Sequence, residues 1–242
     1  MPKLRLLAYN THGLRVGARK VAKAISDEWP DIILMNECGF LGLRLRRLAR
    51  RLGMQAHSGL RMFRPVTNAV LVRPPWRVIE RHNLQFSRVM RRQRRGVVAA
   101  RIGHAGYRLT IASVHLGLSD PERVRHAKEL TDFLAGLAGP HVLGGDLNEG
   151  PERPAAQWIS ERFWDAFAIA GEGEAETFPS RDPRARIDFL FVSEGITVKR
   201  AWVGSDPAMV DASDHRPVFA DVVLEEVTRP HEVPTENVST PC

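Results

Sequence analysis

The chain contains 242 residues, of which 43% are hydrophobic and 26% are charged, as in an ordinary soluble globular protein. Its formal net charge of +7 argues against a cationic substrate and leaves acidic partners such as nucleic acid, phosphorylated metabolites or anionic lipid. A chain of this length buries enough surface to fold without a disulfide or a metal staple.

The cysteines and the N-terminal segment indicate the cellular compartment in which we expect the protein. Cys38 lies in an apolar segment and Cys242 is the last residue, which is not a pattern typical of a structural disulfide, so we expect a reducing environment. The N-terminus has no signal-peptide pattern, and no apolar run approaches the roughly 18 residues that span a bilayer. We therefore expect a cytoplasmic protein without a transmembrane segment, and we favour a monomer.

Short apolar runs of strand length recur along the chain, mostly rich in Val, Ile, Leu or Phe and bounded by Gly, Pro or Asp. The clearest predicted strands are Leu4–Tyr9, Asp31–Asn36, Thr67–Val72, Val97–Ile102, Arg108–Val114, His141–Gly145, Ile187–Val192 and Val218–Leu224. Apolar residues at helical spacing predict helices between some of them, with Asp120 as the N-cap of the third. These helices are Gly17–Trp29, Leu41–Leu52 and Pro121–Leu137.

The order of these elements predicts the fold class. The first part alternates strand and helix, whereas residues 54–114 are mostly strands, with Pro74-Pro75 as a turn. This mixture predicts two packed sheets with helices outside them, a layered α/β sandwich, in one domain over residues 1–227. The polar, proline-containing residues 228–242 predict a flexible tail.

Arginine supplies most of the positive charge and concentrates in two clusters. On the second predicted helix, where the apolar stripe already explains the spacing and predicts a solvated face, lie Arg44, Arg46, Arg47, Arg50 and Arg51. Just before a predicted strand lie Arg88, Arg91, Arg92, Arg94 and Arg95. Five arginines within eight residues are costly to place together without an anion, so the second cluster is either a solvated face or a surface for a polyanion.

Polar residues end or interrupt the predicted strands at six points, where α/β proteins place their chemistry. Each alone is explained by a turn or a helix cap, but six together are not. Asp188 is the hardest to dismiss, because a buried carboxylate inside an apolar run needs a partner. The residues at these points include Asn10, Glu37, His115, Asp146, Asn148, Asp188, Asp214 and His215.

The oxygen donors among these residues suit a hard divalent cation. Carboxylate and amide oxygens fit Mg²⁺ or Mn²⁺, whereas zinc is disfavoured because neither cysteine lies in a ligand pattern. A Mg²⁺ site with few carboxylates usually shares the ion with a substrate phosphate. Together with two histidines that could bind phosphate or transfer protons, the set predicts phosphoester hydrolysis.

Six motifs, in order from Leu4 to about Val223, resemble the endonuclease/exonuclease/phosphatase superfamily. They are Tyr9-Asn10-Thr11-His12-Gly13, Pro30-Asp31-Ile32-Ile33-Leu34-Met35-Asn36-Glu37, Ser113-Val114-His115-Leu116, Gly144-Gly145-Asp146-Leu147-Asn148, Arg186-Ile187-Asp188-Phe189 and Ser213-Asp214-His215-Arg216-Pro217-Val218. The resemblance implies a four-layered α/β sandwich, with two packed mixed β-sheets flanked by helices as in deoxyribonuclease I-like folds. It also implies a hydrolase of phosphoester bonds that depends on Mg²⁺ or Mn²⁺.

The resemblance implies a role for each motif residue. Glu37 is the principal metal ligand, with Asn10 and Asp214 completing the metal site. Asp146 positions or deprotonates the attacking water, and Asn148 orients it. His215, oriented by Asp188, contacts the scissile phosphate or acts as general base, while His115 donates to a phosphate oxygen or to the leaving group. We expect substrate contacts from His12, Arg91, Arg92, Arg94, Arg95 and Arg186.

His115 points to one branch of that superfamily. The exonuclease III-like and apurinic-endonuclease branch usually has a tyrosine-containing segment there, and favours Gln-Glu where this chain has Asn36-Glu37. An abasic-site repair enzyme is therefore disfavoured. His115 is instead similar to the pattern in pancreatic-type deoxyribonucleases, sphingomyelinases, tyrosyl-DNA phosphodiesterases and inositol polyphosphate phosphatases.

Three functions stay open at this point. The positive charge favours an intracellular phosphodiesterase or nuclease that acts on nucleic acid. The same catalytic set would serve a phosphatase or phosphodiesterase for a small phosphorylated metabolite or a lipid headgroup, in which a closed pocket replaces an open basic groove. A non-catalytic binding scaffold is the third, and it is disfavoured because every catalytic position is filled.

Overall fold

The computed structural model describes residues 1–39, 42–59, 67–87 and 94–225. The predicted tail, residues 228–242, and the predicted domain boundary lie outside these ranges. The same holds for Leu41 of the second predicted helix and for Arg88, Arg91 and Arg92 of the second arginine cluster.

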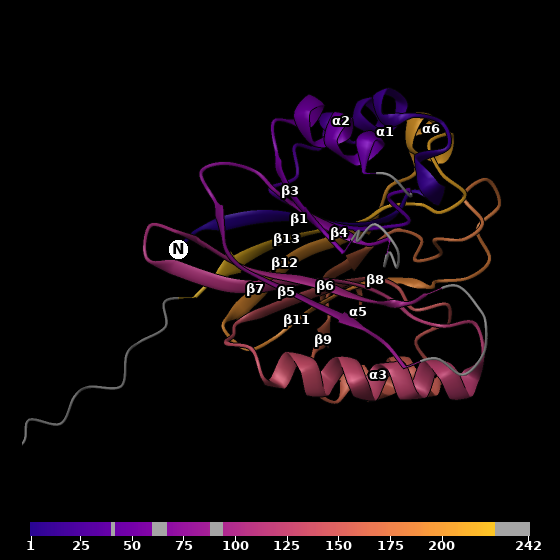
Figure 1. The fold of residues 1–242 in the computed structure, drawn as a ribbon. Helices are drawn as coiled ribbons and strands as arrows, with labels where there is room; N and C mark the ends of the chain where they lie inside the picture. The colour runs from indigo at the N-terminus through magenta and orange to yellow at the C-terminus, as the bar shows by residue number, and fades with distance from the viewer. Residues whose placement is uncertain (40–41, 60–66, 88–93, 226–242) are drawn as a thin grey trace, which may run out of the picture.

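Two β-sheets form the centre of the molecule (Figure 1). The first has seven strands in the order β10 (Gly171–Glu172), β12 (Ile196–Val203), β13 (Val218–Leu224), β1 (Lys3–Asn10), β2 (Ile32–Asn36), β4 (Ala69–Val72) and β3 (Gln55–Ser58). The second has six strands in the order β5 (Arg77–Gln85), β6 (Gly96–His104), β7 (Tyr107–His115), β8 (His141–Asp146), β11 (Asp188–Val192) and β9 (Trp164–Asp165).

Helices cover the outer faces of both sheets, which gives the predicted four-layered α/β sandwich (Figure 1). On the seven-stranded sheet lie α1 (Ala18–Ser26), α2 (Leu43–Leu52) and α6 (Pro207–Val210). On the six-stranded sheet lie α3 (Asp120–Ala135) and α4 (Pro154–Ser160). The remaining short helices are a 3₁₀ turn, His12–Leu14, and α5 (Ala166–Ala170). No helix in the described part of the chain has the length and apolarity needed to cross a bilayer.

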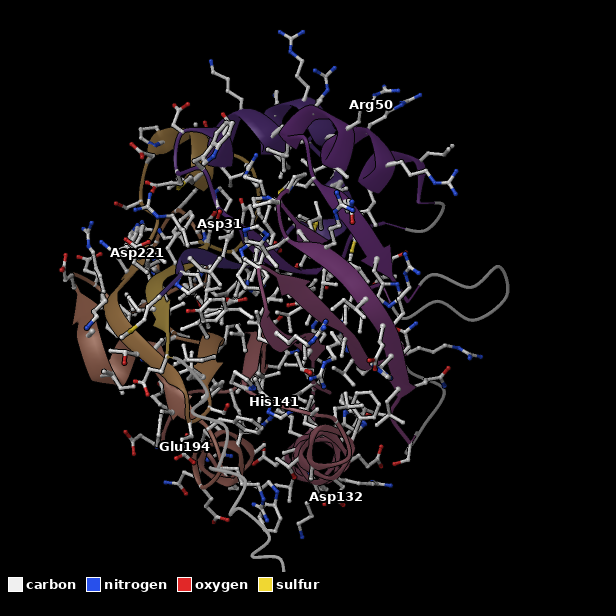
Figure 2. The ribbon with its side chains drawn as sticks, turned by 90° about the vertical axis from the view of Figure 1, so that its left-hand side faces the viewer. Asp31, Arg50, Asp132, His141, Glu194 and Asp221 are labelled. Carbon is white, nitrogen blue, oxygen red and sulfur yellow. The ribbon has the colours of Figure 1, made fainter. Side chains whose placement is uncertain are left out.

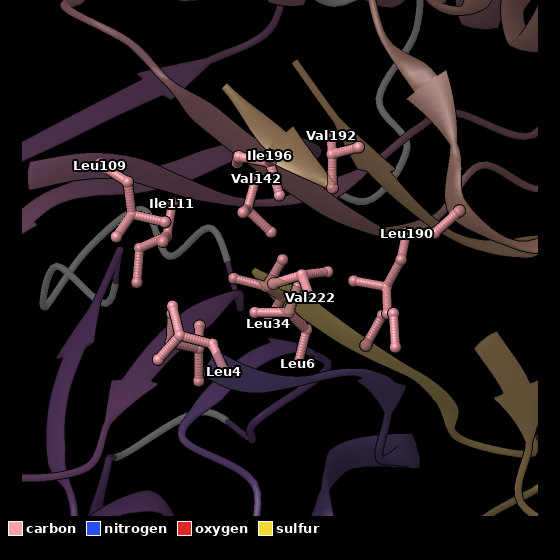
Figure 3. Packing of buried hydrophobic residues seen from close by; sticks show 14 of the residues in the cluster. Leu4, Leu6, Leu34, Leu109, Ile111, Val142, Leu190, Val192, Ile196 and Val222 are labelled. Carbon is pink, nitrogen blue, oxygen red and sulfur yellow. The ribbon is translucent and has the colours of Figure 1, made fainter. Parts of the chain in front are cut away.

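Alternation along the strands builds a separate core on each side of a sheet. In β1, Leu6 and Ala8 face the other sheet, whereas Leu7 and Tyr9 face the helices. Figure 3 shows the layer between the sheets, where aliphatic side chains of both sheets meet. Side chains of a strand alternate between its faces, so a strand buried on both faces reads as a continuous apolar run. That property made most of the central strands predictable.

All eight predicted strands are confirmed to within two residues at either end. Five further strands were not among the predicted ones: β3, β5, β9, β10 and β12. Of these, β5 is largely exposed and polar, and β9 and β10 have two residues each, so these three carry no apolar run. Two details of the helices were wrong. The N-cap of α3 is Ser119, and the carboxylate of Asp120 pairs with arginine side chains instead. Trp29 lies beyond the end of α1, exposed beneath the guanidinium of Arg73.

The strand directions gather the candidate residues at one edge of the sandwich. β1 and β2 are parallel, and so are β7 and β8, so their carboxyl ends lie together. Within the second pair, His115 lies beside Asp146, and the antiparallel β11 places Asp188 on the other side of Asp146. Gly145 makes this edge possible: at φ +142° its Cα faces Val114 O and the Asn36 side chain, where no Cβ would fit.

Candidate active site

Asp146 is the centre of the predicted site. Its Oδ2 accepts a hydrogen bond from Asn10 Nδ2 at 3.0 Å and lies 3.2 Å from His115 Nε2 and 3.9 Å from His215 Nε2. Its Oδ1 accepts from the backbone N–H of Asn148 at 2.8 Å. Burial alone would raise the pKa of Asp146, but the two histidines hold it well below its usual range. The Asp146 side chain is therefore a buried carboxylate that is ionised at neutral pH.

The side chain of Asn36 hydrogen-bonds to strands of the other sheet beside Asp146. Its Nδ2 donates to Ser113 Oγ and to Val114 O, at 3.2 and 2.8 Å, and its Oδ1 accepts from the Asp146 N–H at 2.9 Å. Asn36 belongs to a motif, but the sequence assigned it no role of its own. Because one buried amide joins β2 to β7 and β8, it fixes the distance between the candidate residues of the two sheets.

Arg95 determines which nitrogen of the His115 ring accepts a hydrogen bond. The Arg95 Nη1 lies 2.7 Å from His115 Nδ1, and a guanidinium can only donate, so Nδ1 is the acceptor and Nε2 carries the ring proton. The Nε2–H therefore points at Asp146. Both side chains are buried, with 8% of Arg95 and 2% of His115 exposed. Arg95, predicted as a substrate contact, thus lies behind a catalytic candidate.

His215 and Asp188 form a buried pair. His215 Nδ1 lies 2.8 Å from Asp188 Oδ2, and the Phe178 ring packs against the imidazole with centroids 4.8 Å apart. Burial disfavours the charged imidazole, yet Asp188 and Asp146 outweigh burial and raise the pKa of His215 to about 9. At neutral pH, His215 is an imidazolium that contacts Asp188 through Nδ1.

The pair makes folding stability depend on pH in a defined direction. A folded-state pKa above the ordinary value of about 6.5 means that the pair stabilises the protein fully below about pH 6.5, and that this contribution is lost as the pH rises through about 9. In EDTA, we expect His215→Gln to lower the free energy of unfolding by about 2 kcal/mol more at pH 6 than at pH 10. Urea unfolding at both values measures this, with the exposed His104→Gln as control. An equal loss at the two pH values would contradict it.

Three candidate residues adopt the left-handed backbone conformation, which is unusual for residues other than glycine. They are His12, Glu37 and Asn148, with φ values of 46°, 51° and 55°. Such strained residues cluster at functional sites because the surrounding structure must hold them there. Asn148 is held by a bond from its Nδ2 to Leu116 O at 3.1 Å. Its neighbour Glu149 is buried and accepts from Arg123 Nε at 2.5 Å.

Glu37 offers a carboxylate that is not already used. No described residue donates a hydrogen bond to it or lies within ion-pair distance, whereas the carboxylates of Asp146 and Asp188 are bonded. It follows β2 beside Asn10 at the end of β1, and Thr11 ties the two segments by donating to Asn36 O and Glu37 O. An unpaired carboxylate beside an amide oxygen fits a hard divalent cation.

Asp214, the third predicted metal ligand, lies closer to the protein surface than the buried Asp146 and Asp188. Its side chain is 42% exposed, and its Oδ2 lies 3.4 Å from His12 Nδ1. A different cluster in the described part of the chain has spacing suited to a metal ion: the ligand atoms of Asp146, Asp188 and His215 lie within 4.8 Å of one another. Asp188 also has one buried oxygen, Oδ1, with no hydrogen-bond partner. This buried group could hold a metal as well.

The predicted substrate arginines have different surroundings. Arg94 donates to Gln85 Oε1 at 3.1 Å, beside the buried Arg95. Arg186 pairs with Asp165 and lies over the Phe189 ring, at 4.6 Å from its centroid. Arg91 and Arg92 lie outside the described residues. A role in substrate binding therefore stays a prediction for these residues.

The Arg95–His115 contact was missed, and the hairpin register that the sequence encodes brings the two residues only into the same neighbourhood. The two residues of the turn between β6 and β7, Ala105 and Gly106, have positive φ values of 48° and 85°, as a two-residue hairpin requires. Counting back without a bulge from that turn pairs Gly96 with His115, and Arg95 would continue opposite Leu116. Because side chains alternate between the faces of a strand, this register would place Arg95 on the helix-facing side with Val97 and Leu116, away from the His115 imidazole, so the register alone does not predict the contact.

The chain belongs to the endonuclease/exonuclease/phosphatase family, whose sequence model matches residues 7–215. Members of this superfamily hydrolyse phosphoester bonds and generally depend on a divalent metal. The matched range contains the first five motifs and, of the sixth, Ser213, Asp214 and His215. A search of curated protein sequences found no match.

Solved structures with the same fold share few residues with this chain. A family member from Bacteroides vulgatus superposes with a TM-score of 0.81 at 19% identity, over 93% of this chain and 100% of the other. A mannosyl-6-phosphatase from Bacteroides thetaiotaomicron gives 0.79 at 18% identity, over 91% and 100%. D. rerio TDP2, complexed with a single-strand DNA product, gives 0.76 at 16% identity, over 92% and 100%. These similarities establish the fold.

Proposed function

We propose that this protein is a Mg²⁺- or Mn²⁺-dependent phosphodiesterase that cleaves nucleic acid by in-line attack of water. The observation that carries the proposal is the meeting of Asn10, His115, Asp146 and His215 at one edge, from strand ends of both sheets. Such an arrangement places an ionised carboxylate between two ring N–H donors, which suits a water nucleophile facing a phosphate.

In this proposal Asp146 orients the attacking water, with Asn148 beside it. His215, held as an imidazolium by Asp188, donates from Nε2 to a phosphate oxygen and neutralises the charge that develops in the transition state. His115 can donate only from Nε2, because Arg95 occupies its Nδ1, so on substrate binding it would turn this hydrogen bond from Asp146 to the phosphate. In this arrangement the Asp146 carboxylate accepts a hydrogen bond from the water, and the two histidines donate hydrogen bonds to the phosphate.

Glu37 would hold the divalent cation, with Asn10 and Asp214 completing the site. The unused carboxylate of Glu37 and the all-oxygen donor set fit Mg²⁺ or Mn²⁺. When bound, such an ion lowers the pKa of water and neutralises phosphate charge.

Nucleic acid is the substrate class that the charge supports best. Without the acidic segment 225–242, the chain has 34 basic and 24 acidic residues, so this portion carries about +10. One similar structure, TDP2, holds a single-strand DNA product, whereas another is a mannosyl-6-phosphatase. A small phosphorylated metabolite or lipid headgroup is therefore the alternative substrate.

The buried free thiol of Cys38 supports a reducing, cytoplasmic setting.

A substrate panel tests the proposal. Purified protein is incubated with Mg²⁺ or Mn²⁺ and single-stranded DNA, duplex DNA, RNA, sugar phosphates or phospholipid headgroups, at low salt. We expect cleavage of a nucleic acid that falls steeply with added salt, because phosphate contacts release counterions. Hydrolysis of only the small phosphates would replace nucleic acid by the alternative substrate, and no hydrolysis of any member would contradict an enzymatic role.

A further inference from the structure

A cavity of about 550 Å³ opens beside Glu37. Its walls come from the turn after β1, the segment after β2 and the beginning of α2. Three arginines and one carboxylate line it, together with small and apolar residues. We call this cavity the arginine pocket and define it by Arg15, Glu37, Cys38, Leu43, Arg44 and Arg47.

Among the residues that the structure describes, the arginines of the pocket have no acidic partner. No described carboxylate lies within ion-pair distance of Arg15, Arg44 or Arg47. Arg44 is nevertheless held in place, because its Nη1 donates to the carbonyl oxygens of Gly13 and Leu14 at 3.3 and 3.1 Å. The guanidinium is thereby fixed on the turn that follows Asn10. Its other N–H groups stay available to a ligand, and a guanidinium fork matches the oxygens of a phosphate.

The volume and the lining residues of the arginine pocket indicate the kind of ligand that it can bind. A volume of this order is typical of sites for small molecules and exceeds what one phosphate group fills. The exposed Leu43 and the buried Cys38 add an apolar portion to the wall. The pocket therefore has room for a phosphate with part of the carbon skeleton that bears it.

We propose that the arginine pocket binds a second phosphate of the substrate, next to the phosphate that is cleaved. This inference rests on the proposed function, because it places the reacting phosphate beside Glu37 and Asp146. The second phosphate would come from the neighbouring unit of a nucleic acid strand or from a small bisphosphorylated molecule. Both present the same chemistry to Arg44 and Arg47: a dianionic or monoanionic phosphate attached to a sugar.

Direct binding tests the pocket without relying on turnover. Calorimetry in EDTA, which prevents cleavage, compares a DNA dinucleotide with and without a 5′-phosphate, and fructose 1,6-bisphosphate with fructose 6-phosphate. For Arg44→Gln/Arg47→Gln we expect about tenfold weaker binding of a two-phosphate probe and little change for its one-phosphate counterpart. A loss with the dinucleotide identifies a nucleic acid strand as the source, and a loss with the sugar identifies a small bisphosphate.

Two controls keep the test decisive. Arg50 lies on the outer face of α2 and does not line the pocket (Figure 2), so Arg50→Gln should bind all four probes like the wild type. Arg47→Gln alone leaves the Arg44 contacts to Gly13 and Leu14 intact, so its effect is not a consequence of a displaced turn. An equal loss of affinity for one-phosphate and two-phosphate probes, or no loss of affinity, would show that the arginine pocket does not bind a second phosphate. Absence of hydrolysis by the wild type with Mg²⁺ or Mn²⁺ overturns the proposed function instead.

Discussion

Asp146→Asn is expected to lower kcat for phosphodiester hydrolysis about 1,000-fold or more while leaving the fold intact. The substitution keeps the shape of the side chain but removes its charge and one acceptor oxygen. Asn10 Nδ2 and the His115 Nε2–H both point at Oδ2, so a single amide cannot satisfy them and also accept from water. Steady-state kinetics on bis(p-nitrophenyl) phosphate with Mn²⁺ measures the loss.

The matched control for this variant is Asp132→Asn. Asp132 lies on the solvent side of α3, far from the edge where the strands end (Figure 2). The control should retain the wild-type kcat, and circular dichroism of both variants should match the wild type. An Asp146→Asn variant with more than about a tenth of the wild-type kcat would remove Asp146 from the centre of the mechanism.

Arg95→Met and His115→Gln are each expected to lower kcat about 100-fold, and the double variant should be little worse than either one. The reason is that Arg95 acts through His115: without the guanidinium, Nδ1 loses its donor and the imidazole is no longer fixed with its proton on Nε2. Two residues that act as one unit give strongly non-additive losses in a double-mutant cycle.

Spectroscopy separates this positioning role from a merely structural one. ¹⁵N NMR of the His115 ring should show the Nε2–H tautomer in the wild type and a changed tautomer in Arg95→Met. Arg108→Met, an exposed arginine on the same strand as His115, serves as control. Additive losses in the cycle, with an unchanged ring spectrum in Arg95→Met, would show that Arg95 does not act through His115.

The sequence predicted the central strands and the residues at their ends, since both are recorded locally. A strand buried on both faces is a continuous apolar run, and a polar residue at its end, such as Asp146, is conspicuous. The edge strand β5 has neither property, because its residues from Arg77 to Gln85 are mostly polar and exposed. Its position comes instead from pairing with β6, which is a tertiary constraint.

The contacts within the site depend on register between elements distant in sequence. That Asn36 bridges to Val114 and Asp146 follows from the packing of one sheet on the other, which no local pattern encodes. The arginine pocket arises in the same way, because Arg15, Glu37 and Arg44 belong to three different segments. By spacing alone the helix arginines predicted only a solvated face; two of them, Arg44 and Arg47, line a cavity beside Glu37.

In the proposed function, a divalent cation held beside Glu37 and the carboxylate of Asp146 together hydrolyse a phosphodiester. The most direct test is hydrolysis of a single-stranded oligonucleotide as a function of Mn²⁺ concentration, for the wild type and for Glu37→Gln. We predict no cleavage in EDTA, saturable activation of the wild type, and a requirement for at least about tenfold more Mn²⁺ in Glu37→Gln, since an amide is a weaker ligand than a carboxylate. Cleavage that persists in EDTA, or superimposable Mn²⁺ curves for the two proteins, would contradict it.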